Sequence, residues 1–357
     1  MILDRIADFH KSLKVNVVEL RGISKWTGDP VSIACAVGEK TAFYLADSFL
    51  ETGYQIENLG STWLWDLSDY ALREAPQAIL LFAEIGSENK KLAFYGNRYF
   101  RIPLLVGGCI HLPLDQKIKQ KKSYKEELRR IRKAGFTYEI SRSRSQFDDF
   151  FDNMYIPQIR KSHGRSAVIL DKGTYLKLFN KLELLLVKGG DAVIAGELIS
   201  YEGGMPRLTA VGIRNSDSEL LRQGALAACY LFALQYMGQQ GYSTIDLGDS
   251  RGFVNDGVLS YKRKWGHVLI KRIPLLLLMK VLSNGRAVRR LLRNMPIICM
   301  NDGELTSMVF MDEIELNDVR ASTKFISQNH VPGTKNLVAY LFNDRMTFSK
   351  SDLVTLA

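Results

Sequence analysis

Cysteine is scarce in this chain of 357 residues, which contains only four. Cys35, Cys109, Cys229 and Cys299 lie far apart, show no CxxC spacing and stand in apolar runs. Such residues are typical of reduced, buried cysteines in a cytosolic protein, and not of a disulfide framework or a zinc site. The five histidines are equally scattered. The sequence therefore predicts a protein with no metal centre.

Long apolar runs are also missing. The longest, IPLLLLM at residues 273–279, is far too short to cross a bilayer. The N-terminal segment MILDRIADFHKSLKVNVVEL has acids in its first turn and no uninterrupted apolar stretch, so it fits neither a signal peptide nor a membrane anchor. We therefore expect a cytoplasmic protein. Its 46% apolar content can fill a substantial core, and its length allows two domains.

Acidic residues are absent from residues 257–300, although the chain has 38 Asp and Glu against 48 Lys and Arg. The bases in this acid-free segment are Lys262, Arg263, Lys264, Lys271, Arg272, Lys280, Arg286, Arg289, Arg290 and Arg293. A second basic cluster, residues 117–133, has Glu126 and Glu127 as its only acids. Clusters of this kind predict a polyanionic partner, which would be a phosphorylated cofactor, an RNA such as tRNA, or an anionic membrane surface. Two solvated helix faces would give the same pattern.

The segment SNGRAVRRLLRNM predicts a basic amphipathic helix. At 100° per residue, Val288, Leu291 and Leu292 share one face with Met295, and the arginines spread round the other. Such a helix beside an apolar strand predicts peripheral contact with an anionic membrane, at the inner face of the cell membrane. The alternative is a helix that packs on a sheet and holds its arginines in water.

Strand and helix patterns alternate over the first part of the chain, which predicts a mixed α/β structure over residues 14–108. Trp63 and Trp65 stand at alternate positions in STWLWDLSDY and predict one strand with both indoles on one face. A platform for stacking a ligand is the alternative. Ser123 and Gly135 have the residue types of the two caps of a basic helix.

The second part of the chain predicts a defined order of elements. After two amphipathic helices, LELLLVKG, AVIAGELISYEGG and PRLTAVGI predict an antiparallel meander with glycine turns. DSELLRQGALAACYLFALQYMGQQGY predicts a single long helix. STIDLG is the next strand, DGVLSYKRKWG is a short helix opened by Asp256, and HVLIKRIPLLLL is one more strand.

This order resembles the GNAT acyltransferase fold. The likeness is sharpest in QQGYSTIDLGDS and GVLSYKRKWG, which resemble the strand and the aromatic-lysine helix of the Fem-type and cellulose-biosynthesis-type branch. YKEELRRIRKAGFTYEISRS resembles the start of the second domain in that branch. The resemblance implies an α/β (α+β) fold with a GNAT-like mixed sheet flanked by helices, in two tandem GNAT-like domains. The predicted parts are a degenerate GNAT-like domain at 1–120, the acyltransferase domain at 121–280, and an extension at 281–357 with a basic helix and two strands.

The activity that the resemblance implies is N-acyl transfer from acyl-CoA to an amine by direct attack in a ternary complex. The expected acceptor is an amino sugar, an amino acid or an envelope precursor. One alternative is a Fem-type transferase that uses aminoacyl-tRNA. No heptad segment suited to a tRNA-binding coiled-coil arm occurs in the sequence, which favours acyl-CoA. A non-catalytic GNAT-like scaffold or RNA-binding protein is the second alternative.

In GNAT enzymes the acyl-thioester arm of coenzyme A inserts between two splayed strands, which here are RLTAVGI and STIDLG. The donor's pyrophosphate lies at a helix N-terminus, where LLRQGALA stands in this chain. The family has Arg or Gln where this chain has Leu221, and a Gly-Ala helix packed on a neighbour is the alternative. The predicted donor-binding residues are Val211, Gly212, Ile213, Arg222, Gln223, Gly224 and Ala225.

The resemblance assigns catalytic roles to the aromatic-lysine pair. Lys262 matches the lysine that stabilises negative charge during acyl transfer, and Tyr261 matches the aromatic residue beside the donor. Asp249 and Glu197 are the candidate bases for the incoming ammonium group. A solvated helix end and two structural acids are the alternative.

Overall fold

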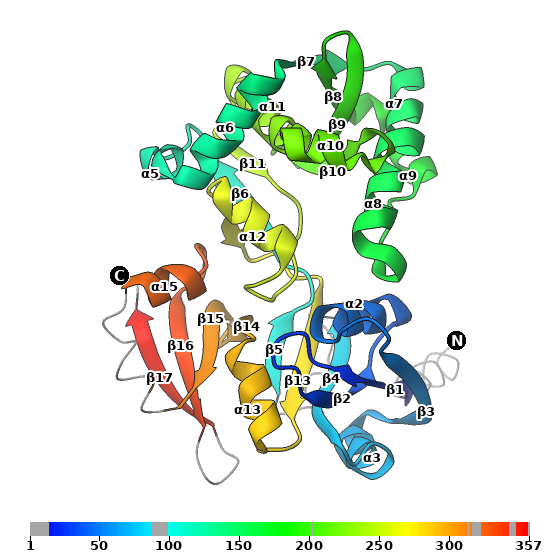
Figure 1. Ribbon diagram of the computed structural model, residues 1–357, viewed down its shortest axis with the longest axis vertical. Helices are drawn as coiled ribbons and strands as arrows, with labels where there is room; N and C mark the ends of the chain where they lie inside the picture. The colour runs from blue at the N-terminus through cyan, green and yellow to red at the C-terminus, as the bar shows by residue number, and fades with distance from the viewer. Residues whose placement is uncertain are drawn as a thin grey trace, which may run out of the picture. The chain divides into compact units, whose positions relative to one another are not determined.

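The computed structural model describes residues 14–86, 99–201, 203–312, 315, 323–342 and 348–355. The chain forms two compact units, and each unit draws on separate segments of the sequence (Figure 1). Unit 1 takes its residues from Met1–Val106, Ser250–Leu259 and Lys271–Ala357. Unit 2 consists of Gly107–Asp249 and Ser260–Ile270.

The limits of these two units differ from the domain boundaries at residues 120 and 280 that the sequence resemblance predicts. The segment HVLIKRIPLLLL shows why, because the single strand predicted there is wrong. Its first half is β12 (Val268–Ile270) in the sheet of unit 2, and its second half is β13 (Leu275–Val281) in the sheet of unit 1. Pro274, which has no backbone N–H to donate, stands between the two strands.

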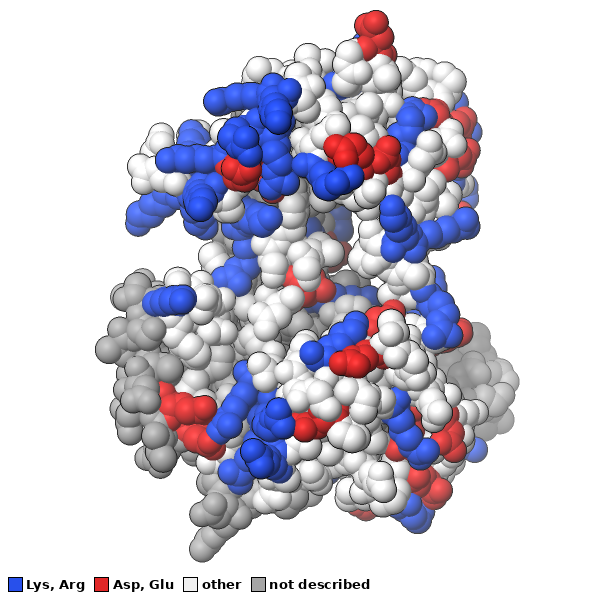
Figure 2. All heavy atoms as spheres, in the orientation of Figure 1, with Lys and Arg blue, Asp and Glu red and all other residues white. Residues whose placement is uncertain are grey.

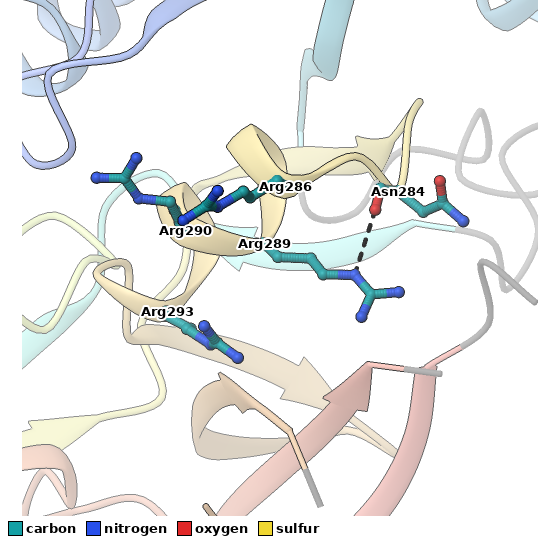
Figure 3. A pocket seen from close by; sticks show the side chains of 5 residues that line it. All are labelled: Asn284, Arg286, Arg289, Arg290 and Arg293. Atoms are coloured by element: carbon teal, nitrogen blue, oxygen red, sulfur yellow. Dashed lines mark hydrogen bonds between the residues drawn. The ribbon is translucent and has the colours of Figure 1, made fainter. Parts of the chain in front are cut away.

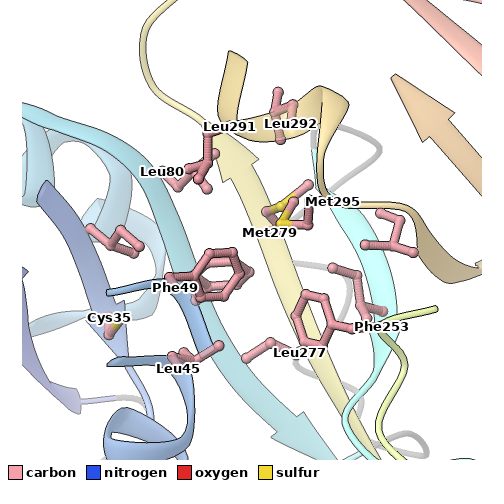
Figure 4. Packing of buried hydrophobic residues seen from close by; sticks show 14 of the residues in the cluster. Cys35, Leu45, Phe49, Leu80, Phe253, Leu277, Met279, Leu291, Leu292 and Met295 are labelled. Carbon is pink, nitrogen blue, oxygen red and sulfur yellow. The ribbon is translucent and has the colours of Figure 1, made fainter. Parts of the chain in front are cut away.

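Unit 1 contains a six-stranded mixed sheet in the order β3-β1-β2-β4-β13-β5. Its other strands are β1 (Lys14–Ile23), β2 (Pro30–Ala36), β3 (Gln55–Trp63), β4 (Ala78–Gly86) and β5 (Phe100–Pro103). Helices α2 (Glu39–Phe49) and α13 (Arg286–Arg293) contribute to one apolar core on this sheet, whose members include Phe49, Phe253 and Leu277 (Figure 4). Helix α3 (Leu67–Glu74) contributes to a second core cluster with the same sheet.

The strand predicted to run through both tryptophans ends early. Strand β3 stops at Trp63, and a 3₁₀ turn, Leu64–Asp66, carries Trp65. The two indoles nevertheless lie against each other, with ring centroids 5.0 Å apart and planes 6° from parallel. Both residues are well exposed, with relative exposures of 39% and 54%.

Residues 281–357 contain more strands than the two predicted. The segments TSMVFMDEI and KNLVAYLFND do contain strands, β15 (Glu304–Met311) and β16 (Asn336–Phe342). They are the central strands of a four-stranded sheet, flanked by β14 (Ile297–Asn301) and β17 (Phe348–Thr355). Helix α15 (Thr323–Asn329) lies in the connection between β15 and β16, which run parallel.

The basic helix α13 packs its apolar face inward. Val288, Leu291, Leu292 and Met295 are all buried in the core of unit 1 (Figure 4). Of the two predicted arrangements, the structure therefore has the helix packed on a sheet, and this apolar face cannot insert into a membrane as folded. Contact of the arginines alone with an anionic membrane stays a prediction.

The arginines of α13 line an open recess together with Asn284 (Figure 3). Most of them have acidic partners within unit 1. Arg290 pairs with Asp29 at 2.9 Å, and Arg289 and Arg293 both pair with Asp312. The positive charge of this face is therefore partly neutralised.

Unit 2 contains a seven-stranded sheet in the order β12-β6-β11-β10-β9-β8-β7. Its other strands are β6 (Gly107–His111), β7 (Phe136–Ser141), β8 (Leu182–Gly189), β9 (Ala192–Ser200), β10 (Arg207–Ile213) and β11 (Thr244–Asp246). The predicted meander is confirmed, since β8, β9 and β10 pair antiparallel in sequence order. The mixed α/β fold class with helix-flanked sheets is also confirmed.

Two layers of helices cover the sheet of unit 2. Helices α6 (Lys122–Ala134) and α11 (Ala225–Gln239) share one core cluster with alternate residues of β8 and β9. Helix α7 (Arg144–Phe150) and the π-helical turn Phe151–Tyr155 pack on the residues between them, and α8 (Ile156–His163) continues this layer. The long helix predicted from residue 217 to 242 is broken at Gly224, which separates α10 (Ser218–Gln223) from α11.

The break has a local cause. Gly224 has φ +96°, a left-handed conformation that ends α10 and that glycine adopts without steric cost. Its N–H donates to the carbonyl of Leu221 at 3.1 Å.

Among the described residues, no helix is long and apolar enough to cross a membrane.

Candidate active site

Strands β10 and β11 of unit 2 run parallel but pair at only one position among the described residues, Arg207 opposite Asp246. Beyond Asp246 the chain stays beside β6, with which β11 is paired, because the N–H of Leu247 donates to the carbonyl of Gly108 at 2.9 Å. Strand β10 continues as far as Ile213, paired with β9 on its other side. The two parallel strands therefore separate beyond Arg207, which is the arrangement expected from the GNAT resemblance.

The predicted donor-binding residues of β10 differ in their surroundings. Val211 lies directly opposite Glu197 of β9 and is half-buried, whereas Ile213 is completely buried in the core. Gly212 packs against the π-helical turn, where an added Cβ would lie 2.5 Å from the backbone of Met154 and Tyr155. Close packing with this turn therefore requires glycine at position 212, and this requirement does not depend on a bound donor.

The predicted phosphate-binding residues also fall into two groups. Arg222 and Gln223 lie at the surface, where both contact Glu219, and Arg222 is 74% exposed. Gly224 and Ala225 instead lie under α6, since Ala225 is completely buried and a Cβ on Gly224 would be 3.4 Å from Cβ of Arg130. With its N–H bonded to Leu221, Gly224 does not offer that group to a phosphate in this conformation.

Lys262 lies in α12 (Gly257–Lys264) and is 96% buried, with a relative exposure of 4%. Its Nζ donates to the backbone carbonyl of Asp249 at 2.7 Å. A buried ammonium group needs such oxygen partners, because removing it from water is costly. The cation is therefore fixed beside the loop that follows β11.

Tyr261 lies among aromatic rings, unlike its neighbour Lys262. Its ring meets that of Tyr230 edge-on at 5.4 Å between centroids, and Lys264 Nζ lies 5.1 Å from its centroid. Tyr230 in turn stacks on Trp265. Burial raises the pKa of Tyr261 well above its ordinary value. Tyr261 is thus part of an aromatic group that helps to fix α12 against α11.

Glu197 lies in the middle of β9, on the face covered by α11, and only 2% of it is exposed. Burial raises the pKa of Glu197 well above that of an ordinary glutamate, and the nearby charge of Lys262 opposes part of this rise. Its Oε2 has no hydrogen-bond partner among the described residues. A buried acid whose pKa is raised in this way is a candidate for proton exchange with a substrate.

Asp249 is held in an ion pair. Arg207 donates to Asp249 Oδ2 at 3.0 Å and to Asp246 Oδ2 at 3.4 Å, so one guanidinium group joins the two acids. Asp246 Oδ1 also accepts the N–H of Gly248 at 2.7 Å. The Asp249 carboxylate is therefore fixed by Arg207 at the end of β11.

His267 is a further residue of this site that sequence reasoning missed. It is completely buried beside Gly108 of β6, where an added Cβ would lie 1.7 Å from Nε2. Neither ring nitrogen has a hydrogen-bond partner among the described residues. Burial, with the charges of Lys262 and Arg263, lowers the pKa of His267 to about 3. Its position directly after Gly266 in the aromatic-lysine segment was the only signal in the sequence.

A basic surface covers the helices at one side of unit 2 (Figure 2). It is formed by α5 (Gln116–Gln120) and α6, and its exposed members are Lys117, Lys121, Lys122, Lys125, Arg129, Arg132 and Lys133. We call these residues the α6 basic surface. Few acids balance it, since Glu126 pairs with Arg129, and Glu127 is buried next to Arg130 and Lys264.

Comparisons with known proteins give only distant structural likenesses. No family model matches the chain, and no curated protein sequence matches it. Among solved structures, L-PGS from Bacillus licheniformis is similar at 15% identity, over 68% of this chain and 82% of that one, with a TM-score of 0.36. FemX is similar at 13% identity, over 71% and 82% of the two chains, with a TM-score of 0.38.

A GCN5-related N-acetyltransferase from Sphaerobacter thermophilus is similar at 11% identity, over 75% of this chain and 78% of that one, with a TM-score of 0.32. Identities and TM-scores this low establish no shared activity or substrate. The chemistry of this chain has to be judged from the side chains of unit 2.

Proposed function

We propose that unit 2 is an N-acyltransferase of the GNAT type, which moves an acyl group from an acyl thioester to an amine. The observation that carries the proposal is the burial of Lys262 and Glu197 in one unit, with the two charges close enough to affect each other. A protein that only forms a scaffold has no need to bury an ammonium group and an acid with an unpaired oxygen, which costs ~1–3 kcal/mol for each unsatisfied group.

The separation of β10 and β11 supports an extended donor in this unit. Beyond Arg207, β10 has an edge that is not paired with β11, and an extended thioester arm can bond to such an edge as an added strand does. This edge leads from Arg207, which holds Asp246 and Asp249, toward Val211 and Gly212. The donor roles of Val211, Gly212 and Ile213 remain part of the proposal.

In the proposed reaction the amine nitrogen attacks the carbonyl carbon of the donor and forms a tetrahedral oxyanion. Lys262 stabilises the negative charge of that oxygen. Glu197, in its ionised form, accepts the proton that the attacking nitrogen loses and passes it to the leaving sulfur as the C–S bond breaks. The products are an amide and a free thiol, and no covalent enzyme intermediate forms.

The α6 basic surface supports a donor that carries several phosphates. Coenzyme A has a pyrophosphate and a further phosphate, and basic side chains attract such groups over the range of electrostatic screening. A tRNA carries many more phosphates, so the same surface favours aminoacyl-tRNA as the second candidate donor. With that donor the chemistry differs only in the leaving group, which is a ribose oxygen.

The donor is tested by calorimetry of the full-length protein with acetyl-CoA and, separately, with uncharged tRNA. Saturable binding of acetyl-CoA alone supports the first donor, and binding of tRNA alone supports the second. Binding of neither would overturn the proposal.

The role of Lys262 is tested by release of free thiol from acetyl-CoA in the presence of amino sugars and amino acids. We expect Lys262→Ala to lower turnover by a factor of about 100 or more, the loss typical of one oxyanion donor, with little change in donor affinity. Lys264→Ala, in the same helix but partly exposed, is the matched control and should keep most of the activity. Both variants must show the wild-type thermal transition, and wild-type turnover in a folded Lys262→Ala protein would refute the assignment.

A further inference from the structure

Strand β3 forms one edge of the six-stranded sheet of unit 1 (Figure 1). One side of this strand pairs with β1 along nearly its whole length, and no described strand pairs with the other side. Residues 55–58 are all exposed, so this part of the edge faces solvent. Backbone N–H and C=O groups along the free side are therefore available to pair with a further strand.

Strand β3 lacks the residues that usually protect a sheet edge. Its sequence, QIENLGSTW, contains no lysine, arginine or proline. Its only charged residue, Glu57, pairs with Arg21 of β1 at 2.9 Å. Edge strands of monomeric proteins commonly carry lysines or prolines, because an unprotected edge pairs with other chains. The composition of β3 therefore favours a partner strand.

Apolar side chains are concentrated at this edge. The described residues include seven exposed large apolar side chains, and five of them lie in β3 or in segments next to it. Trp63 and Trp65 stand at one end of β3 and Leu72 in the following helix α3, whereas Ile56 stands at the other end and Ile23 at the adjoining end of β1. Exposed apolar side chains gathered on one part of a surface are typical of a protein–protein contact.

The one irregularity of β3 is a bulge near its middle. Leu59 is an extra residue there, since Asn58 and Gly60 pair with consecutive residues of β1. The polar groups at the bulge have partners within the same chain. The hydroxyl of Tyr70 donates to the carbonyl of Leu59 at 2.5 Å, and the N–H of Gly60 donates to Asn58 Oδ1 at 3.0 Å. The bulge therefore separates two regular stretches of the free edge and needs no partner itself.

Ile56 and Trp63, on either side of the bulge, lie on the same face of the sheet. Ile56 is opposite Leu20, which belongs to the core cluster that contains α2. Thr62 is opposite Val15, which belongs to the second core cluster. Alternate residues of β2 divide between these two clusters in the same way, so the clusters lie on opposite faces. Trp63, the residue after Thr62, therefore points to the face of Ile56.

We propose that β3 pairs antiparallel with β3 of a second copy of this chain, which gives a homodimer with a continuous sheet. A twofold axis perpendicular to the sheet keeps each face common to both copies, so Trp63 of one copy lies opposite Ile56 of the other. Thr62 then lies opposite Glu57, and no like charges face each other. The two bulges meet at the axis, where their polar groups are already bonded. This dimer uses unit 1 alone and does not depend on the proposed acyl transfer.

An extended peptide of another protein can bond to a sheet edge as well. The pattern of β3 favours a second copy, because the apolar residue at each end of the strand has its matching residue at the opposite end of the same strand. Aromatic and β-branched residues directly opposite each other stabilise a strand pair, and Trp63 with Ile56 makes this combination twice in the dimer.

The association is tested by sedimentation velocity of the full-length protein over a range of concentrations. We expect a reversible monomer–dimer equilibrium with a dissociation constant of about 10 µM or lower. Ile56→Lys should raise this constant by about tenfold or more, because it places a charge on the edge and removes the contact with Trp63. A protein that stays monomeric at about 100 µM, or a dimer that Ile56→Lys leaves unchanged, would overturn the proposal.

Val168→Lys is the matched control for the charge. Val168 belongs to unit 2 and is 58% exposed, so this substitution adds the same charge and removes an exposed apolar side chain away from β3. It should leave the dimer as in the wild type. Circular dichroism checks that both variants are folded, which is expected because both positions are exposed. Equal weakening by the two substitutions would be a general effect of charge and would contradict the proposed contact.

Cysteine variants test the register and distinguish a second copy from another partner. Ile56→Cys and Trp63→Cys are made as separate proteins, which is feasible because the four native cysteines are all buried. A mixture of the two should form a disulfide-linked dimer on mild oxidation, since directly opposite Cβ atoms lie about 5 Å apart. Neither variant alone should cross-link, because the two copies of either position lie about 20 Å apart along the paired strands. Equal cross-linking of the single variants, or none in the mixture, would overturn this pairing.

Discussion

Buried polar side chains decide the chemistry of unit 2 at the scale of single residues. Lys262, Glu197 and His267 are all nearly or completely buried, and two of them have polar atoms without a hydrogen-bond partner in the described part of the chain. Such groups oppose folding, and in native proteins they call for a specific explanation such as a catalytic role or a bound water. A family resemblance predicted Lys262, and Glu197 was predicted from its place in the central strand of the meander. It could not predict His267, because the contact that encloses its ring comes from Gly108, which is remote in the sequence.

The pKa of His267 leads to a prediction about stability at acid pH. The folded-state pKa is about 3 and lies below the unfolded value of ~6.5, so only the unfolded chain binds this proton between those values. The stability associated with neutral His267 is therefore fully present above about pH 6.5. It is lost as the pH falls toward 3, by at most ~1.4 kcal/mol per pH unit.

Urea unfolding at pH 7, 5.5 and 4.5 measures this effect. His267→Asn has no imidazole to protonate, so its free energy of unfolding should fall less steeply with acid than that of the wild type. His111→Asn, at an exposed histidine of the same unit, should follow the wild-type slope. Parallel slopes for wild type and His267→Asn would show that the buried imidazole does not control acid stability.

Gly212 gives a second prediction at the residue scale. Because a Cβ at position 212 would lie 2.5 Å from backbone atoms of the π-helical turn, Gly212→Ala should lower the free energy of unfolding by ~1–3 kcal/mol through overpacking. Gly257→Ala is the matched control, since the space round Gly257 is open. Thermal and urea unfolding of the two variants measure the difference. An unchanged stability for Gly212→Ala would mean that the turn shifts to make room.

At the scale of elements, local patterns predicted the strands better than the helix boundaries. The meander β8-β9-β10 followed from alternating apolar residues and glycine turns, which are local signals. The break at Gly224 was missed, because a glycine within a helical pattern is tolerated in many helices and its left-handed conformation depends on packing under α6. Strands β14 and β17, the two edge strands of the sheet that contains β15 and β16, were missed as well.

The α6 basic surface carries the prediction that belongs to this scale. We expect this surface to attract the donor phosphates. A triple variant with Gln in place of Lys122, Lys125 and Arg129 should therefore bind the donor several-fold more weakly at low salt. It should also reduce the dependence of affinity on salt, because fewer charges are left to be screened. Calorimetry at two salt concentrations measures both effects.

The control for this surface is the basic helix of unit 1. Replacing Arg286, Arg289 and Arg293 with Gln removes the same number of charges, and donor binding should stay as in the wild type. These arginines also offer a test of the membrane prediction, since co-sedimentation with anionic liposomes should fade in the triple variant and at high salt. A donor affinity that responds equally to both triple variants would indicate a general charge effect and no specific surface.

At the scale of the whole molecule, the chain builds its two units from interleaved segments. The sequence resemblance followed one continuous stretch and placed a domain at 121–280, whereas the sheet of unit 2 also needs β6, which lies before residue 120. Strand β6 is hydrogen-bonded to both β11 and β12, so it is the only link between β12 and the rest of that sheet in the described topology. Such a pairing between distant segments has no local signal in the sequence.

The interleaving predicts which fragment of the chain folds by itself. A fragment of residues 107–270 contains all seven strands of unit 2, so it should show a cooperative thermal transition and a dispersed amide NMR spectrum. A fragment of residues 121–280 lacks β6, so β12 has no partner and the edge of β11 is exposed. The same fragment carries the apolar strand β13 without its partners β4 and β5. It should therefore aggregate or unfold without a cooperative transition. Cooperative folding of the 121–280 fragment and failure of the 107–270 fragment would reverse this assignment and return the boundary to residue 120.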